Sequence, residues 1–176
     1  MKTAGFLLVL VTFAGLAAGQ QLNWNYEKLA ARASDSVDVN LDGSVLRLAT
    51  KFLSSDDPDE AKVKKLVEGL KGIYVKTFEF KNPGDYSPAD VEPFRAQLRS
   101  PDWQRIVGVH GKEDGEDVDV YIKPDAKGIG GLAIIAAKPK ELTLVNIVGA
   151  IDLDSLSELG GHLNIPEFEV EKKKKK

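Results

Sequence analysis

The residues most able to do acid–base or metal chemistry surround one predicted hairpin, where His110 precedes the carboxylates Asp114, Asp117 and Asp119. A histidine beside a carboxylate can act as a general base, and clustered carboxylates can bind a divalent cation. These residues make a metal-assisted or acid–base hydrolase one candidate function. Acidic hairpins are also ordinary solvated surface that discourages edge-to-edge strand pairing, and we favour this simpler interpretation.

A second group of oxygen ligands consists of Asp38, Asn40 and Asp42, which stand at alternate positions before Gly43. This spacing matches the first half of a calcium-binding loop. The twelfth position of such a loop needs a bidentate glutamate, and here it is Ala49. The same alternation is typical of a β-strand. We therefore expect a strand, an Asp-Gly turn and a helix start, with a metal site as the alternative.

Aromatic and basic residues offer two further binding surfaces. Trp103, Tyr74 and Tyr121 could line a ligand surface on a sheet, although aromatic residues on strands more often pack in the core. The C-terminal tail ends in Lys172, Lys173, Lys174, Lys175 and Lys176. Such a run attracts an anionic membrane surface by about 1 kcal/mol per lysine, or it serves only as a solubilising terminus.

The composition excludes several classes of site. The 176 residues include no cysteine and only two histidines. Disulfides, thiolate zinc sites, iron–sulfur clusters and cysteine nucleophiles are therefore excluded. The chain contains neither a nucleophile-elbow pattern around a serine nor a phosphate-binding loop pattern, and we expect no cofactor.

The N-terminus has the three-part layout of a secretory signal peptide. Lys2 precedes an apolar run over residues 4–18, and small residues lead to Gly19. The run is shorter than the roughly 20 residues that span a bilayer, so we expect cleavage after Gly19 rather than an uncleaved anchor. The expected location is the periplasm or the exterior of a bacterial cell.

The net charge is −3 for the whole chain, but the predicted signal peptide and the lysine tail hide a more acidic body. Leaving out Lys2 and the five C-terminal lysines gives −9 for residues 20–171. An acidic, exported body makes nucleic acid an improbable partner.

Hydrophobic periodicity predicts helices early in the chain and strands late. Helices are expected over residues 22–33, 45–53, 58–72 and 87–101, with a short one starting at Asp152 and ending at Gly160. Strands are expected over residues 36–41, 73–80, 103–109, 118–123, 129–137 and 142–148. In the alternating stretch 116–123 we expect Val118, Val120 and Ile122 to point inward and Asp117, Asp119 and Tyr121 to point outward.

Short, turn-rich joints between the last four strands indicate an antiparallel meander. The predicted class is therefore α+β, with helices packed on one face of an antiparallel sheet that has a C-terminal four-strand meander. We divide the chain into a signal peptide (residues 1–19), a single α+β domain (residues 20–166) and a disordered charged tail (residues 167–176).

Four groups of residues carry a family resemblance: LDGS at 41–44; KGIYV at 71–75 with FEF at 78–80; Trp103 with RIVGV at 105–109; and LTLVNIVG at 142–149 with IDL at 151–153. With the signal peptide, they resemble bacterial exported proteins of the domain of unknown function 4252, over about residues 26–166. The resemblance implies an exported α+β domain with no established activity, so no catalytic residue is carried over.

The function that we expect is therefore a non-enzymatic exported domain that binds an envelope protein or a small ligand. Binding would use the sheet face or the edge between helices and sheet. A hydrolase that uses His110 and its nearby carboxylates is the first alternative, and peripheral association with a membrane through the lysine tail is the second.

Overall fold

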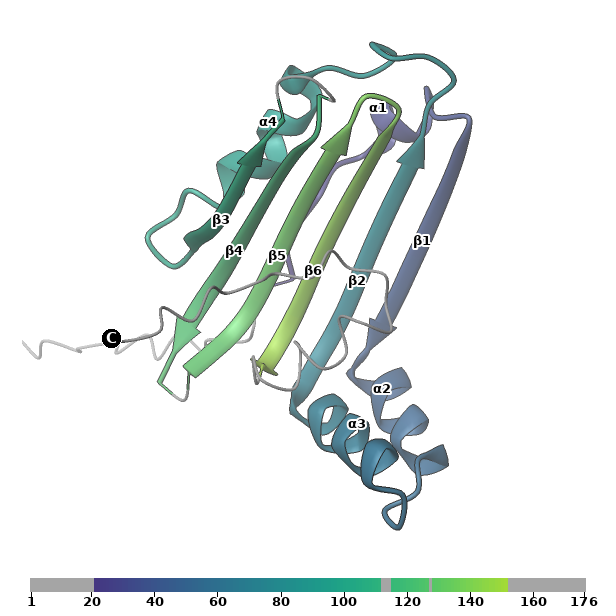
Figure 1. Cartoon of the computed structure of the whole chain (residues 1–176), viewed down its shortest axis with the longest axis vertical. Coiled ribbons are helices and arrows are strands. Elements are labelled where there is room, and N and C mark those ends of the chain that lie inside the picture. The colour runs from purple at the N-terminus through teal and green to yellow at the C-terminus, as the bar shows by residue number, and fades with distance from the viewer. Residues whose placement is uncertain (1–20, 112–114, 127, 152–176) are drawn as a thin grey trace, which may run out of the picture.

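The structure is a computed structural model, and it describes residues 21–111, 115–126 and 128–151 (Figure 1). The helices are α1 (Glu27–Ala30), α2 (Gly43–Ala49), α3 (Pro58–Gly69) and α4 (Pro88–Gln97), with a 3-10 turn η1 (Thr50–Phe52) after α2. The strands are β1 (Asp35–Asp42), β2 (Leu70–Glu79), β3 (Gln104–His110), β4 (Asp117–Asp125), β5 (Gly128–Lys138) and β6 (Glu141–Ile151). None of these described helices has the length and apolar character needed to cross a membrane.

The six strands form one antiparallel sheet in the order β1-β2-β6-β5-β4-β3. The last four strands are neighbours in chain order, which confirms the predicted C-terminal meander. β5 and β6 lie at the centre of the sheet, as the apolar character of residues 129–137 predicts. The predicted signal peptide, the short helix expected after Asp152 and the lysine tail lie outside the described residues.

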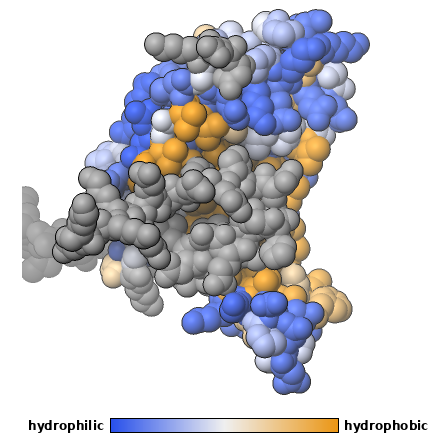
Figure 2. Space-filling model, viewed as in Figure 1, coloured by the Kyte–Doolittle hydropathy of each residue, from blue (hydrophilic) through white to orange (hydrophobic). Residues whose placement is uncertain are grey.

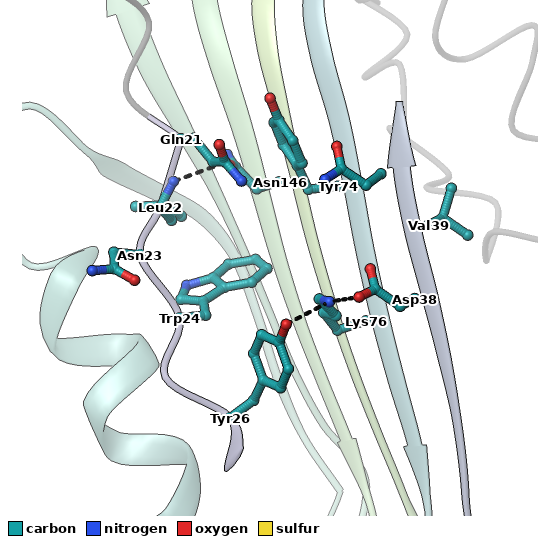
Figure 3. Close-up of a pocket in the computed structure, with 11 residues that line it drawn as sticks. Gln21, Leu22, Asn23, Trp24, Tyr26, Asp38, Val39, Tyr74, Lys76 and Asn146 are labelled. Carbon is teal, nitrogen blue, oxygen red and sulfur yellow. Dashed lines mark hydrogen bonds and ion pairs between the residues drawn. The ribbon is translucent and has the colours of Figure 1, made fainter. Parts of the chain in front are cut away.

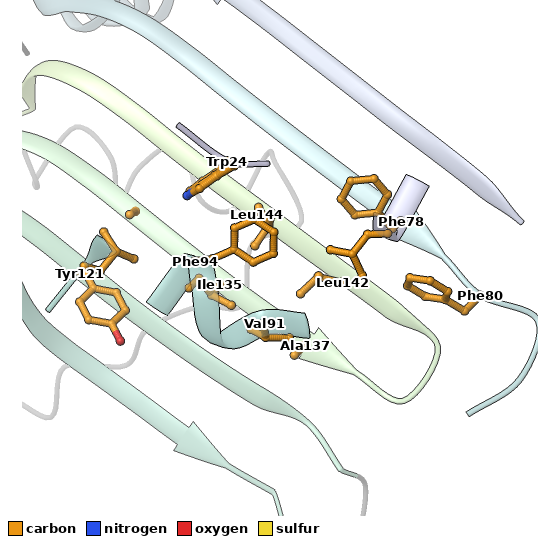
Figure 4. Packing of buried hydrophobic residues seen from close by; sticks show 13 residues of the cluster. Trp24, Phe78, Phe80, Val91, Phe94, Tyr121, Ile135, Ala137, Leu142 and Leu144 are labelled. Atoms are coloured by element: carbon orange, nitrogen blue, oxygen red, sulfur yellow. The ribbon is translucent and has the colours of Figure 1, made fainter. Parts of the chain in front are cut away.

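The helices confirm the α+β class, and they occupy two different places (Figure 1). α1 and α4 lie on one face of the sheet, and their side chains form the main core with β2, β5 and β6 (Figure 4). Leu29, Val91 and Phe94 from these helices, and Leu98 at the C-terminal end of α4, are buried in that core. α2 and α3 instead pack at one end of the sheet, where they contact β1, β2 and β6.

Local signals set the starts of two helices as the sequence predicts. Asp57 accepts hydrogen bonds from the backbone N–H groups of Asp59 (2.9 Å) and Glu60 (3.1 Å), and Pro58 opens α3. At α4, the backbone N–H of Ser87 donates to the carboxylate of Asp90 (2.9 Å).

The helix predicted over residues 22–33 is wrong in extent, because only α1 is helical. The backbone N–H of Leu22 donates to the side-chain oxygen of Asn146 on β6 (3.1 Å), and Trp24 is buried in the main core. These contacts hold residues 21–26 on the sheet in place of the first helical turns. The helix predicted over residues 45–53 begins earlier, at Gly43, since Asp42 provides its N-cap.

The predicted orientation of β4 is also wrong for Asp119 and Tyr121. Both were expected to point outward, yet Asp119 is 1% exposed and Tyr121 is 7% exposed, on the face that α4 covers. Val120 belongs to a second buried cluster on the other face. Alternation along a strand separates two faces but does not say which one is covered.

Candidate functional site

A pocket of about 420 Å³ lies between the N-terminal segment and the part of the sheet formed by β1, β2 and β6 (Figure 3). Its volume falls within the range of small-molecule sites. The residues that line it are Gln21, Leu22, Asn23, Trp24, Tyr26, Asp38, Val39, Asn40, Tyr74, Lys76 and Asn146. They come from parts of the chain that only the folded sheet brings together.

Lys76 on β2 provides the positive charge of the pocket. Its Nζ donates a hydrogen bond to Tyr26 Oη (2.8 Å), pairs with the carboxylate of Asp38, and lies 4.2 Å from the centroid of the Tyr26 ring. The Lys76 side chain is 15% exposed. Because Asp38 and Lys76 are the charged groups among the lining residues, the pocket carries no net charge.

Asn146 on β6 joins the N-terminal segment to the floor of the pocket. The residue is 1% exposed; its side chain accepts from the Leu22 N–H (3.1 Å) and donates to the backbone oxygen of Leu132 (3.3 Å). Buried amides need such partners, and here both partners are main-chain groups. Asn146 therefore holds the N-terminal segment, which forms one wall of the pocket, against the sheet.

Three aromatic residues, Trp24, Tyr26 and Tyr74, form apolar walls of the pocket. Packing behind the pocket supports two of them: the Trp24 ring lies edge-on to Phe94 (centroids 6.1 Å apart, 82° between planes), and the Tyr26 ring packs on Phe78 (5.9 Å). These ring contacts orient the two side chains as well as burying them.

The position of Tyr74 depends on Gly72, which stands two residues earlier on β2. A Cβ atom at Gly72 would lie 2.5 Å from Tyr74 Oη and 2.7 Å from its Cε2. The Tyr74 side chain therefore lies along the strand, in space that any larger residue at position 72 would fill.

Four side-chain amides complete the lining: those of Gln21, Asn23, Asn40 and Asn146. Each amide offers both donors and an acceptor, so the set suits a ligand whose groups do the same. Histidine, serine and cysteine are not among the described lining residues.

His110, from the sequence-predicted acid–base cluster, lies far along the sheet on the edge strand β3. Its Nδ1 contacts the carboxylate of Asp117, which also accepts from Arg95 Nη2 (3.0 Å). Burial raises the pKa of Asp117, but hydrogen bonds from His110 and Arg95 outweigh burial and lower the pKa below its usual value. This pairing favours the charged form of the Asp117 carboxylate.

Asp119 is held by two arginines. Its carboxylate accepts from Arg95 Nε (2.9 Å) and Arg105 Nη1 (3.1 Å). Both oxygens are thus engaged in ion pairs beneath α4. Asp114 lies outside the described residues, and among those described no group of three potential metal ligands is found.

The structure separates the three residues of the half-matched calcium loop. Asp38 and Asn40 line the pocket, whereas Asp42 caps α2 and accepts from the N–H groups of Ser44 (2.8 Å) and Val45 (3.0 Å). The hydrogen bond from the Ser44 hydroxyl, with those from the two N–H groups, lowers the pKa of Asp42. Each carboxylate therefore already has a partner.

Of the three aromatic residues that the sequence offered as a ligand surface, Tyr74 lines the pocket, whereas Trp103 and Tyr121 lie elsewhere. Trp103 is half-buried against the main core, and Tyr121 is buried within it. The lysines of the tail lie outside the described residues. Binding through the tail stays a prediction, and Trp103 and Tyr121 pack in or against the main core.

The sequence reasoning missed Trp24, Lys76 and Asn146 as site residues. Asn146 carried a usable signal, because it interrupts the apolar run 142–149 of a central strand and a buried amide requires partners. Lys76 had no such signal, since lysine is common on strand surfaces.

Comparison with known proteins places the chain in a family. No curated protein matches it, and no solved structure matches it. A family model described as Domain of unknown function (DUF4252) matches residues 26–159, which include the strands and helices described above. The chain is therefore a member of the DUF4252 family.

Proposed function

We propose that the protein is exported to the bacterial cell envelope and acts there as a non-enzymatic binding module. The pocket beneath the N-terminal segment would take a small, uncharged, polyhydroxylated ligand with one or two rings, of the sugar class. One observation carries this proposal: three aromatic rings and four amides converge on one pocket of about 420 Å³.

The chemistry of the lining selects this ligand class. Hydroxyl groups donate and accept hydrogen bonds, as the amides of Asn23 and Asn40 do. The flat faces of Tyr74 and Trp24 suit the C–H faces of a ring. The Lys76–Asp38 pair adds a charged donor and a charged acceptor without a net charge that would favour an ion.

Export rests on the N-terminal pattern and on the resemblance of the chain to exported proteins. The absence of cysteine fits a domain that is stabilised by its core alone. The attraction of the lysine tail to an anionic membrane stays a prediction. The hydrolase alternative loses support, because the carboxylate of Asp119 is engaged by Arg95 and Arg105.

Ligand binding can be followed with the chain's own tryptophans, Trp24 in the pocket and Trp103 outside it. In a Trp103→Phe variant, Trp24 is the remaining indole. Titration with a panel of neutral mono- and disaccharides is expected to give a saturable change in Trp24 fluorescence. Adding Tyr74→Ala should weaken binding at least about tenfold, which equals about 1.4 kcal/mol. The proposal fails if no sugar gives saturation, or if Tyr74→Ala leaves the affinity unchanged.

Gly72→Ala is expected to lower ligand affinity about tenfold, a loss of about 1.4 kcal/mol, without unfolding the protein. The new methyl group would occupy the space of the Tyr74 ring and displace it, and the far end of a side chain can move at small cost. Gly108→Ala is the matched control: its Cβ would meet the Arg105 guanidinium at 3.3 Å, and Gly108 does not line the pocket. Calorimetric titration of both variants tests this; equal affinities would contradict the role given to Tyr74.

A further inference from the structure

The face of the sheet turned away from α1 and α4 is apolar across all six strands. Paired positions form a continuous row across it, composed of Val39, Val75, Val145, Ile134, Val120 and Val107. Directly paired residues point to the same side of a sheet, so this row is one surface. In the next row, Ile147 pairs with Leu132.

None of the described helices covers this second face, because α1 and α4 lie opposite and α2 and α3 lie at the end of the sheet. Hydrophobic residues are visible on it in Figure 2. At the rim, Val37 is 53% exposed and Val109 is 50% exposed. Monomeric proteins rarely leave an apolar surface of this extent in contact with water, so we expect an element that covers it.

The last residue of β6 contributes its side chain to this face. Ile151, the last residue of β6, is buried in the same cluster as Val120 and Leu132. The described part of the chain therefore ends with a side chain on the apolar face. The family match continues to residue 159, so the first part of the segment that follows β6 belongs to the family domain.

The sequence of the segment suits an amphipathic helix. Leu153, Leu156 and Leu159 fall within one stripe at 100° per residue, whereas Asp154 and Glu158 fall on the opposite side. Residues 152–159 would span about 12 Å as a helix, which is about half the roughly 24 Å width of six strands. The apolar stripe and the apolar face are complementary in character, and the helix would cover about half of the width of the sheet.

We propose that residues 152–165 are the occupant of the second face. Residues 152–159 dock as a helix through Leu153, Leu156 and Leu159, and Gly160-Gly161 lets Leu163 and Ile165 extend the cover. The sheet then has an apolar layer on each face. Since this proposal concerns the opposite side of the sheet, it does not depend on the ligand pocket.

Disulfide trapping tests the docking in the full chain, which has no cysteine of its own. Ile147→Cys with Leu156→Cys places one thiol on the second face and one in the leucine stripe. Oxidation with copper phenanthroline should cross-link most molecules within the monomer. Ile147→Cys with Glu158→Cys is the matched control, and it should cross-link at least several-fold less, because its second thiol points away and disulfides need Cα atoms within about 7 Å.

Three outcomes would overturn the proposal: covalent dimers, which would indicate that a second copy occupies the face; equal cross-linking of the two pairs; or no cross-linking with both thiols freely alkylated. A second measurement avoids cysteine. Leu156→Asp should raise the fluorescence of an added hydrophobic dye several-fold by uncovering the face, whereas Ser157→Asp should not. Equal dye binding by these two variants would also overturn the proposal.

Discussion

Arg95→Ala is expected to lower the free energy of unfolding by about 3–5 kcal/mol, the cost of leaving a buried charge without its partner. The Asp119 side chain is 2% exposed, and Arg95 Nε is one of its two partners. The remaining partner is Arg105, whose side chain is about half exposed and well hydrated. The loss extends to Asp117, which Arg95 also contacts. Urea unfolding of the variant and the parent chain measures the difference.

Arg105→Ala is the matched control for this change. It removes a guanidinium from the same carboxylate, but from the solvent side, so its cost should be about 1 kcal/mol or less. Equal costs for the two variants, or a cost below about 1 kcal/mol for Arg95→Ala, would contradict the burial of the ion pair beneath α4.

Phe94→Ala is expected to destabilise the protein by about 3–5 kcal/mol, the typical cost of removing a buried phenylalanine ring. Phe94 is 1% exposed, and it joins α4 to the sheet and to the edge of the Trp24 ring. Since Trp24 also lines the pocket, ligand affinity should fall together with stability. Thermal and urea unfolding, followed by sugar titration, measure the two effects.

Glu92→Ala, on the exposed side of the same helix, serves as the control for Phe94→Ala. Glu92 pairs with Arg99 on the surface, and such a pair contributes at most about 1 kcal/mol. If Phe94→Ala cost no more than Glu92→Ala, α4 would not be the helix that closes the main core.

Local chemistry explains the parts of the fold that the sequence predicted. Asp57-Pro58 and Ser87-Pro88 place a cap and a preorganised first residue side by side, so α3 and α4 start where expected. Short joints between β3, β4, β5 and β6 allow only neighbouring antiparallel strands, which gave the meander. In each case the deciding groups are within a few residues of each other.

The parts that sequence reasoning missed depend on partners far apart in the chain. Leu22 and Asn146 are 124 residues apart, and their hydrogen bond helps to hold residues 21–26 on the sheet rather than in a helix. Asp119 lies inside because Arg95, from a separate helix, offsets its charge. Periodicity reports amphipathic spacing, but it carries no information about which distant group compensates a buried charge.

In the candidate site, too, the sequence identified some of the residues, whereas their role depends on distant partners. Asp38 and Asn40 were singled out as metal ligands because of their spacing, and the strand that this spacing also predicts directs them into the pocket. Their chemistry there follows from Lys76, whose ammonium group pairs with Asp38. The residues were identifiable from the sequence, whereas their role required the pairing of β1 with β2.

The measurement that tests the ligand pocket most directly is a nitrogen–proton NMR titration of the labelled full chain with the best sugar of the panel. Side-chain signals report on the site, namely the amides of Asn23 and Asn40 and the indole N–H of Trp24. We expect these signals to shift in a saturable manner, while the indole N–H of Trp103 stays unchanged. Saturable shifts confined to other residues, or no shifts at millimolar sugar, would contradict the pocket as the binding site.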